Sequence, residues 1–230
     1  MTFDLMPDET IEYANKFEWG ENNIVTLTGG RKSGRESLAL EHKGRSYSIK
    51  RLAACLNADS WILVMKATVQ LFQDMDEAFT DYLGIAKCNS EGEAIAEINR
   101  LFAKEKDGAH KYYVILKDYT TPIGLFYVYG YHEKYKRCSL ALGLSKRYRG
   151  EGLAVEIIKR VCDDLIMQGI NRISLEVETT NVSSLKCCEK LCTELGFQKE
   201  GILRNLYGKG VDCVVFSVIS ENRLTSVNAF

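Results

Sequence analysis

The stretch from Arg137 to Gly169 constrains the fold most strongly, because a strand pattern is followed there by a long helical one. Arg137 to Leu144 is a β-rich run, and the loop SKRYRGEG follows it. Gly169 stands where a helix C-terminal cap belongs. Between the loop and Gly169, apolar residues recur at helical spacing and line one face: Leu153, Ala154, Ile157, Ile158, Val161, Cys162 and Leu165. This unit predicts helices layered on a sheet.

Two helices are expected earlier in the chain. The first covers residues 53–72, and the second covers residues 90–103. Ser90 followed by Glu93 forms a capping box at the start of the second helix. The apolar stripe of the first helix is predicted to consist of Ile62, Met65, Val69 and Phe72.

The remaining elements are mostly strands. Strands are predicted over residues 112–116, 123–129, 172–178, 197–203 and 211–219, and a helix over 182–195, ending at Gly196. In the strand at 172–178, alternation places Glu176 and Glu178 on the face opposite Ile173, Leu175 and Val177. The order of elements predicts a mixed α/β fold, α+β-like, with a central mixed sheet covered by helices on both faces.

The first 45 residues differ in texture from the rest. Short strand-like runs occur at residues 23–28, 37–42 and 46–52. We therefore expect an N-terminal extension over 1–45, a main domain over 46–223 and a tail over 224–230. Short strands need an edge to pair with, so the extension is expected to pack on the sheet edge or on a second subunit, as in a homodimer.

Composition excludes several classes of protein. Thirty basic and 31 acidic side chains leave a net charge of -1, without the basic excess that nucleic-acid binding requires. There is no run of about 18 apolar residues for a membrane span, and the N-terminus has no secretory pattern. Eight cysteines are then expected as reduced thiols in a cytoplasmic protein. No C-x-x-C pair occurs and only three histidines are present, so no metal site is expected.

The loop from Arg147 to Gly152 has the features of a phosphate-binding loop. Backbone N–H groups at the start of the following helix lack helical partners, and the helix dipole favours negative charge there. Gly150 and Gly152 let the backbone approach a ligand closely. Arg147 and Arg149 are expected to add mobile positive charge at the rim. A tight strand-to-helix connection without a ligand is the alternative interpretation.

A strand, the pattern R-x-x-G-x-G and a long helix, in this order, resemble the GNAT acetyltransferase superfamily. The segments VETTNVSSLKCCEKL and ELGFQKEGILRN resemble the same superfamily, and the resemblance extends over residues 112–219. It is strongest for the branch that acetylates N-terminal amines of ribosomal proteins and for its polyamine- and antibiotic-acetylating relatives. The resemblance implies acetyl-CoA as co-substrate and direct transfer to an amine acceptor. The alternative is a degenerate acetyl-CoA-binding module, a sensor or interaction domain without turnover.

The resemblance also implies the cofactor-binding residues. In the family, the strand before the loop pairs with the pantetheine arm, the loop holds the pyrophosphate through main-chain N–H groups, and an Asn at the head of the next helix lies near the thioester. Carried onto this chain, these residues are Leu142, Gly143 and Leu144, then Arg147, Tyr148, Arg149, Gly150, Glu151, Gly152, Leu153 and Ala154, and finally Asn181 with Ser184. Capping of the helix is the alternative role for Asn181.

The family's catalytic positions are altered in this chain. Where many relatives have a Tyr that protonates the leaving thiolate, this chain has Cys188, or Cys192 when counted back from Gly196. Both cysteines could instead be small core residues. The branch's Glu in the strand before the loop is replaced by Ser139. The remaining candidates for the base are Glu176, Glu178, His132 and Glu133, and Glu178 is preferred because it lies nearest Asn181.

Two groups of residues are candidates for binding the acceptor. Carboxylates between the first two predicted helices could attract a cationic amine, unless they are simply solvated: Asp74, Asp76, Glu77 and Asp81. Tyr127, Tyr129 and Tyr131 stand at strand spacing on one predicted face. They could line an acceptor pocket or pack against the helices.

Overall fold

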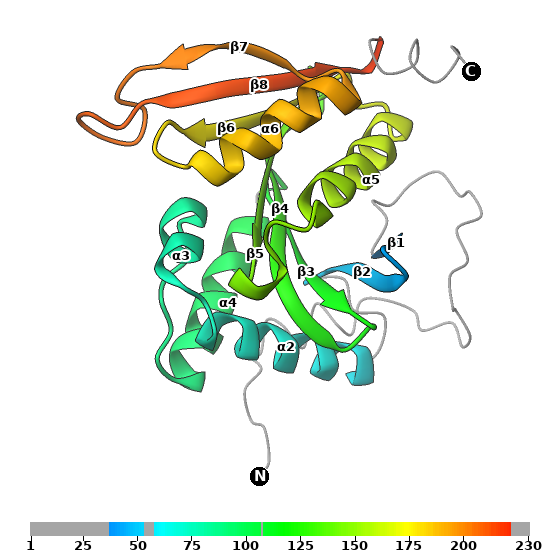
Figure 1. The fold of residues 1–230 in the computed structure, drawn as a ribbon. Helices are drawn as coiled ribbons and strands as arrows, with labels where there is room; N and C mark the ends of the chain where they lie inside the picture. Colours follow the sequence, from blue (N-terminus) through cyan, green and yellow to red (C-terminus); the bar gives the residue numbers. More distant parts are fainter. Residues whose placement is uncertain (1–36, 53–57, 107, 222–230) are drawn as a thin grey trace.

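A single eight-stranded mixed sheet runs through the computed structural model, which describes residues 37–52, 58–106 and 108–221 (Figure 1). Its strand order is β1-β2-β3-β4-β5-β6-β8-β7. β5 and β6 are parallel, and the other neighbouring strands are antiparallel. The strands are β1 (Ser37–His42), β2 (Arg45–Arg51), β3 (Lys111–Lys117), β4 (Thr121–His132), β5 (Arg137–Leu144), β6 (Arg172–Glu178), β7 (Gln198–Leu203) and β8 (Cys213–Ile219).

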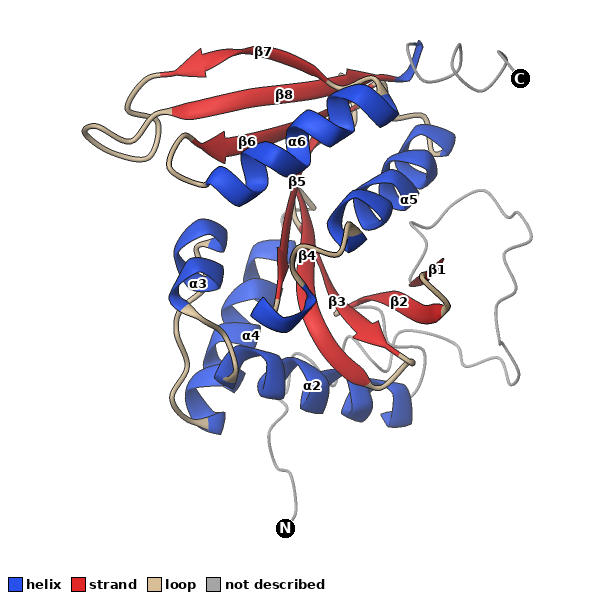
Figure 2. Ribbon diagram, in the orientation of Figure 1, coloured by secondary structure: helices blue, strands red, loops and turns tan. Residues whose placement is uncertain are grey.

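Helices cover both faces of this sheet (Figure 2). They are α2 (Ala58–Gln73), α3 (Glu77–Leu83), α4 (Glu91–Glu105), α5 (Leu153–Met167) and α6 (Val182–Leu195). One buried core lies between the sheet and α5 with α6, and a second lies between the sheet and α2, α3 and α4. The predicted mixed sheet with helices on both faces is therefore confirmed.

The elements around the β5–α5 loop agree with the sequence patterns that predicted them. α5 buries its apolar face, from Leu153 to Leu165, and Gly169 follows it with φ +88°. In β6, Ile173, Leu175 and Val177 are buried, and the residues between them are half-buried on the other face. The predicted bounds of β5, β6 and α6 match the structure. Strand alternation and helical periodicity in the local sequence were therefore sufficient to predict these elements.

The expected face of α2 was correct in part. Only Ile62 departs from the expected stripe, because it is 52% exposed, whereas Phe72 is buried and Met65 and Val69 pack against the same core. The helix also buries Val64, Ala67 and Leu71, which the expected stripe left out. The sequence is apolar around most of the helix, so spacing alone does not select one stripe. The short helix α3 was not predicted at all, although Asp76 caps it by accepting a hydrogen bond from the Phe79 N–H.

The two N-terminal strands belong to the same sheet as the rest. β1 and β2 form an antiparallel hairpin, and β2 pairs with β3. This confirms strands at 37–42 and near 46–52, and it places the hairpin on the sheet edge as expected. The strand expected at residues 23–28, the remainder of 1–36 and the tail from 222 lie outside the described residues. The division at residue 45 remains a prediction.

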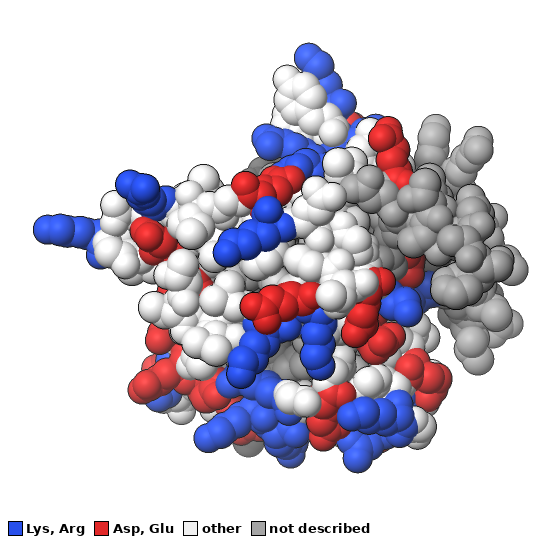
Figure 3. Space-filling model, turned by 45° about the horizontal axis from the view of Figure 1, so that its top comes forward, with Lys and Arg blue, Asp and Glu red and all other residues white. Residues whose placement is uncertain are grey.

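The described surface has charges of both signs. On the face shown in Figure 3, Lys and Arg side chains lie among Asp and Glu side chains, in keeping with the net charge of -1. Within the described part of the chain, no helix is long and apolar enough to cross a membrane. The same residues contain no group of three or more His, Cys, Asp or Glu side chains that could hold a metal ion.

Candidate active site

Strands β5 and β6 pair over a short distance and then diverge (Figure 1). Their last parallel pair is Ser139 with Ser174, whereas β5 stays paired with β4 as far as Leu144. The Ser145 N–H donates to the Ile123 carbonyl on the β4 side at 2.8 Å. Alternation along an antiparallel pair then turns the backbone groups of Leu142 and Leu144 towards β6. An extended ligand can therefore pair with the predicted Leu142 backbone.

The β5–α5 loop, residues 145–152, leads from the diverging strand to the start of α5. Lys146–Tyr148 forms a single 3₁₀ turn, and Gly152 is the N-cap of α5. Gly150 and Gly152 have φ of +80° and +86°, a conformation that side chains with a Cβ rarely adopt. The Val155 N–H bonds to the Gly152 carbonyl at 3.1 Å, so the N–H groups before it, at Leu153 and Ala154, are the ones that helix geometry leaves without an intrahelical partner, as anion binding requires.

Arg149 does not provide the mobile rim charge that was predicted. Its guanidinium donates to both carboxylate oxygens of Asp76, with Nη1···Oδ2 at 2.8 Å and Nη2···Oδ1 at 2.7 Å. Its Nε–H donates to the Leu144 carbonyl at 2.7 Å. These bonds turn Arg149 inward, because its fork geometry matches the carboxylate of Asp76. Arg147 remains exposed, with its guanidinium 5.0 Å from the centre of the Tyr148 ring.

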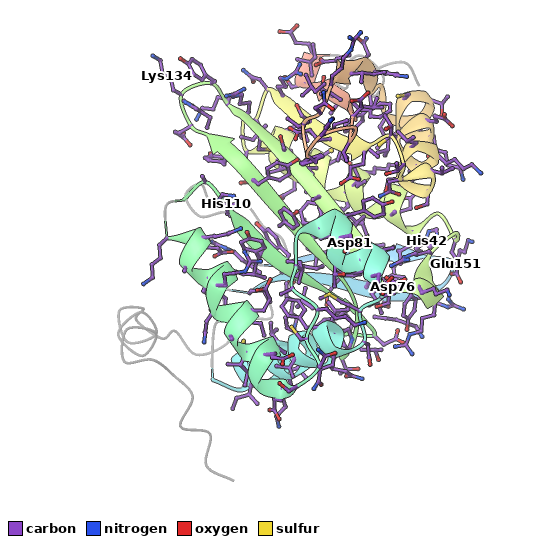
Figure 4. All side chains as sticks on the ribbon, turned by 90° about the vertical axis from the view of Figure 1, so that its left-hand side faces the viewer. His42, Asp76, Asp81, His110, Lys134 and Glu151 are labelled. Carbon is purple, nitrogen blue, oxygen red and sulfur yellow. The ribbon has the colours of Figure 1, made fainter. Side chains whose placement is uncertain are left out.

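The β1–β2 hairpin contacts the other side of the same loop. His42 Nε2–H donates to the Glu151 carbonyl at 3.1 Å, and Arg45 Nη1 lies 3.4 Å from Glu151 Oε2. In Figure 4, His42 and Asp76 lie near Glu151 on the right-hand side of the molecule. Neither the contact of His42 with Glu151 nor that of Asp76 with Arg149 could be predicted from sequence patterns, because the partners lie 109 and 73 residues apart.

The head of α6 has the predicted polar residues. Asn181 is the N-cap, and its Oδ1 accepts hydrogen bonds from the Ser184 N–H at 3.1 Å and the Ser183 hydroxyl at 3.0 Å. The capping role considered for Asn181 is therefore present. Contact of Asn181 or Ser184 with a ligand remains a prediction.

Cys188 and Cys192 both contribute to the core under α5 and α6. Cys188 is 3% exposed, and Cys192 is half-buried against the same cluster. Burial raises the pKa of both thiols, so each is protonated at neutral pH. This placement favours packing over acid catalysis for the two cysteines.

The carboxylates of β6 lie on the sheet face opposite α5 and α6. Glu176 Oε2 accepts a hydrogen bond from the Tyr207 hydroxyl at 3.1 Å. Burial, and then the charge of Glu176, raise the pKa of both Tyr129 and Tyr207. Glu178 lies two residues further along β6, and its Oε2 accepts a hydrogen bond from the Thr180 hydroxyl at 3.4 Å. Glu176 is thus the β6 carboxylate that is hydrogen-bonded to a phenol, and its charge also acts on Tyr129.

The tyrosines of β4 were expected to share one face of the sheet, but they do not. Tyr127 packs against the α2–α4 core and donates to the Leu83 carbonyl at 3.1 Å, and its ring centre lies 5.6 Å from that of Tyr129. Tyr131 instead packs against the core under α5 and α6. The register of β4 shifts between Tyr129 and His132, and Gly130 has φ +59°. This irregularity reverses the face of Tyr131.

The other candidate bases are bound within their own turn. Glu133 forms an ion pair with Lys136 and accepts a 2.6 Å bond from the Tyr131 hydroxyl. His132 Nδ1 accepts from the Tyr135 N–H at 3.4 Å. Of the predicted acidic cluster, Asp76 is bound to Arg149, whereas Asp74, Glu77 and Asp81 are exposed.

Known proteins resemble this chain in sequence and in fold. The model of the acetyltransferase (GNAT) domain matches residues 65–194. An uncharacterised N-acetyltransferase, p20 of Bacillus licheniformis, is 27% identical over 151 residues, covering 64% of this chain and 83% of that protein.

Two solved structures share the fold. Spermidine N-acetyltransferase from Vibrio cholerae, in complex with CoA and spermine, has a TM-score of 0.57 at 18% identity and covers 74% of this chain and 96% of its own. Mycobacterium smegmatis RimJ, in complex with CoA-disulfide, has a TM-score of 0.56 at 15% identity, with 84% of this chain and 94% of its own covered.

Proposed function

The chain belongs to the GNAT acetyltransferase family, and on that basis we propose that it acetylates a primary amine held beside Glu176. Family membership confirms the predicted class of enzyme, an acetyltransferase, and its co-substrate, acetyl-CoA. The acceptor amine, the base and the cofactor contacts are the parts that we add. Each is supported by the geometry of the strands β5 and β6 and of the loop between β5 and α5.

The cofactor contacts follow the divergence of β5 from β6. The backbone of Leu142 faces β6 and can pair with the pantetheine arm of acetyl-CoA. The pyrophosphate then meets the first turn of α5 and the backbone at Gly150 and Gly152, which has no Cβ in the way. Lys146 and Arg147, both exposed, supply positive charge beside it.

The observation that carries the proposal is the position of Glu176 among Tyr129 and Tyr207. An alkylamine has a pKa of about 10, so it arrives as a cation and must lose a proton before it can attack. The Glu176 carboxylate attracts the cation and accepts the proton, directly or through one water. We therefore place the base at Glu176 instead of Glu178, which has only a long hydroxyl contact.

The reaction then proceeds by direct attack. The lone pair of the amine nitrogen forms a bond to the thioester carbonyl carbon, and the carbonyl electrons move to oxygen. Collapse of this intermediate breaks the carbon–sulfur bond and releases the CoA thiolate, and the attacking nitrogen gives its second proton to water, which leaves a neutral amide. A thiol of this kind has a pKa of about 8.5, so the thiolate leaves without strong acid assistance and takes a proton from water.

The acceptor is expected among small amines and protein N-termini. The V. cholerae structure is named as a spermidine N-acetyltransferase and holds spermine, and this likeness supports testing polyamines first. A second candidate function is an acetyl-CoA-binding module without turnover. It is favoured by buried Cys188 at the position where many relatives have the acid. Amine-dependent release of CoA separates the two functions.

A matched pair of variants tests the assignment of the base. Glu176→Gln and Glu178→Gln both remove one carboxylate from the same face of β6 while preserving shape. We expect Glu176→Gln to lower kcat by about 100-fold or more, the usual contribution of a general base, and Glu178→Gln to leave it within about threefold. Acetyl-CoA affinity, measured by calorimetry, should be unchanged in both. If only Glu178→Gln loses kcat, Glu178 and not Glu176 is the base.

A further inference from the structure

We propose that Asp76 and Arg149 form a latch that fixes the β5–α5 loop to helix α3, so that Arg149 positions the loop instead of binding phosphate. The inference rests on the proposed function, because it concerns how acetyl-CoA is bound. It assigns a role to Asp76, a residue that the sequence associates only with the acceptor.

All three nitrogens of the Arg149 guanidinium donate a hydrogen bond within the protein. Both terminal nitrogens bond to Asp76 and Nε–H bonds to the Leu144 carbonyl, at 2.7 to 2.8 Å. Leu144 is the last residue of β5, so one side chain ties together the end of the strand, the loop and the start of α3. Charge-assisted bidentate pairs of this kind have a defined geometry as well as energy.

Helix α3 is itself held against β5, which makes it a firm anchor. A Cβ placed on Gly143 would lie 2.4 Å from Leu83 Cδ1 and 3.2 Å from Phe79 Cε2, so the glycine permits α3 to pack on the strand. The C-terminal end of α3 is fixed by the bond from Tyr127 to the Leu83 carbonyl. The latch therefore connects the loop to an element that already lies on the acceptor side of the sheet.

The negative charge of Asp76 must be neutralised by Arg149 if the loop is to bind an anion. The hydrogen bonds from Arg149, together with the charge of Lys146, hold the pKa of Asp76 below its usual value, so Asp76 is ionised at neutral pH. An ionised carboxylate at the loop would repel a pyrophosphate unless it were neutralised. Arg149 neutralises Asp76, and Lys146 and Arg147 remain as the cations available to the phosphates.

The test uses variants that change the pair without removing the helix cap. Asp76→Asn keeps an oxygen that can accept from the Phe79 N–H, so it removes the charge and retains the N-cap. Arg149→Gln removes the guanidinium, and Arg149→Lys keeps the charge without the fork. The double variant Asp76→Asn with Arg149→Gln measures the coupling between the two residues.

Calorimetry with acetyl-CoA and steady-state kinetics give the readouts. We expect Asp76→Asn and Arg149→Gln each to raise the Kd and KM for acetyl-CoA about tenfold, equivalent to about 1.4 kcal/mol. The double variant should bind no more weakly than either single variant, and Arg149→Lys should fall between them and the wild type. At saturating acetyl-CoA, kcat should stay within about twofold, because bound ligand restores the loop.

Glu200→Gln is the matched control. It breaks the bidentate pair between Arg172 and Glu200, whose side chains are 37% and 35% exposed, against 32% and 34% for Arg149 and Asp76. This pair joins β6 to β7, away from the loop. We expect an acetyl-CoA Kd equal to that of the wild type.

Three results would overturn the latch. If Arg149 binds phosphate, Asp76→Asn frees it, and the acetyl-CoA Kd stays the same or falls while Arg149→Gln raises it. If Glu200→Gln weakens binding as much as Asp76→Asn, the effect is general destabilisation. If Asp76→Asn lowers kcat with KM unchanged, the pair only maintains the folded fraction. Failure of the wild type to bind acetyl-CoA is a different result and refutes the proposed function itself.

Discussion

Two glycines of the β5–α5 loop show how a single residue type serves both fold and site. Gly150 and Gly152 have positive φ, which a residue with a Cβ adopts at a cost of about 1–2 kcal/mol. A Cβ on Gly150 would meet no atom within 4 Å, and one on Gly152 would come no closer than 3.9 Å to His42. The protein itself therefore leaves this space open, as the proposed pyrophosphate site requires.

Gly152→Val should abolish measurable acetyl-CoA binding in a protein that still folds. The valine occupies the space that the pyrophosphate needs, and the strain at φ +86° disturbs the start of α5. Gly169→Val at the other end of α5, with φ +88° and open space, carries the same backbone strain and should keep wild-type affinity. Calorimetry on both folded variants decides the matter, and wild-type affinity in Gly152→Val would disprove the position of the phosphate site.

Cys188→Ala and Cys192→Ala should each lower kcat by less than tenfold, or about 1.4 kcal/mol of barrier. Both side chains pack in the core, and burial keeps both thiols protonated. Cys188→Ala should also lower thermal stability more than Cys192→Ala, because Cys188 is the more buried. A hundredfold loss of kcat with unchanged acetyl-CoA affinity in either variant would instead identify a catalytic thiol.

Single residues could be predicted where their role is local. The glycines of the loop and the Asn181 cap follow from the short stretch of chain around them. The inward turn of Arg149 could not be predicted, because Asp76 lies 73 residues away in the sequence. The contact between Glu176 and Tyr207 could not be predicted for the same reason, since that tyrosine reaches Glu176 from the β7–β8 connection.

Among the elements, the β1–β2 hairpin is the one whose importance for the site was unexpected. It lies on the edge of the sheet, yet its turn contacts the β5–α5 loop through His42 and Arg45. The loop is thus supported from two sides by segments that precede it in the chain, α3 and this hairpin. Support of both kinds keeps the backbone N–H groups of the loop in place before a ligand arrives.

Removing the hairpin contacts should weaken acetyl-CoA binding without affecting the chemical step. His42→Ala removes one hydrogen bond to the Glu151 carbonyl, with a usual value of about 0.5–1.5 kcal/mol, so a rise in Kd of about two- to tenfold is expected. Lys43→Ala, in the same turn and exposed, is the control and should bind normally. An unchanged Kd in the double variant His42→Ala with Arg45→Ala would show that the hairpin does not support the loop.

Elements with a single clear period were predictable, and those without one were not. β6 alternates strictly, and α5 has one apolar face, so their bounds followed from the sequence. α2 is apolar on several sides, and packing against α4 and the sheet selects which side is buried. α3 has seven residues, which are too few to show a helical period, although Asp76 and Gly84 cap its two ends.

At the scale of the whole molecule, the described residues form two separately packed cores on one sheet. One core fixes α5 and α6 beside the diverging strands, and the other fixes α2, α3 and α4 on the face where Glu176 lies. Acetyl-CoA and the amine would therefore approach the strands from different sides and meet where β5 leaves β6. Such an arrangement suits direct transfer in a ternary complex, because neither substrate has to leave before the other binds.

Amine-dependent release of CoA from acetyl-CoA tests this account most directly. Initial rates should be measured with wild-type protein and Glu176→Gln over a panel of polyamines, amino sugars, aminoglycosides and N-terminal peptides. We expect saturable release of CoA with at least one primary amine, and a loss of about 100-fold in Glu176→Gln. Tight binding of acetyl-CoA with no amine-dependent release across the panel would contradict it and identify a binding module without turnover.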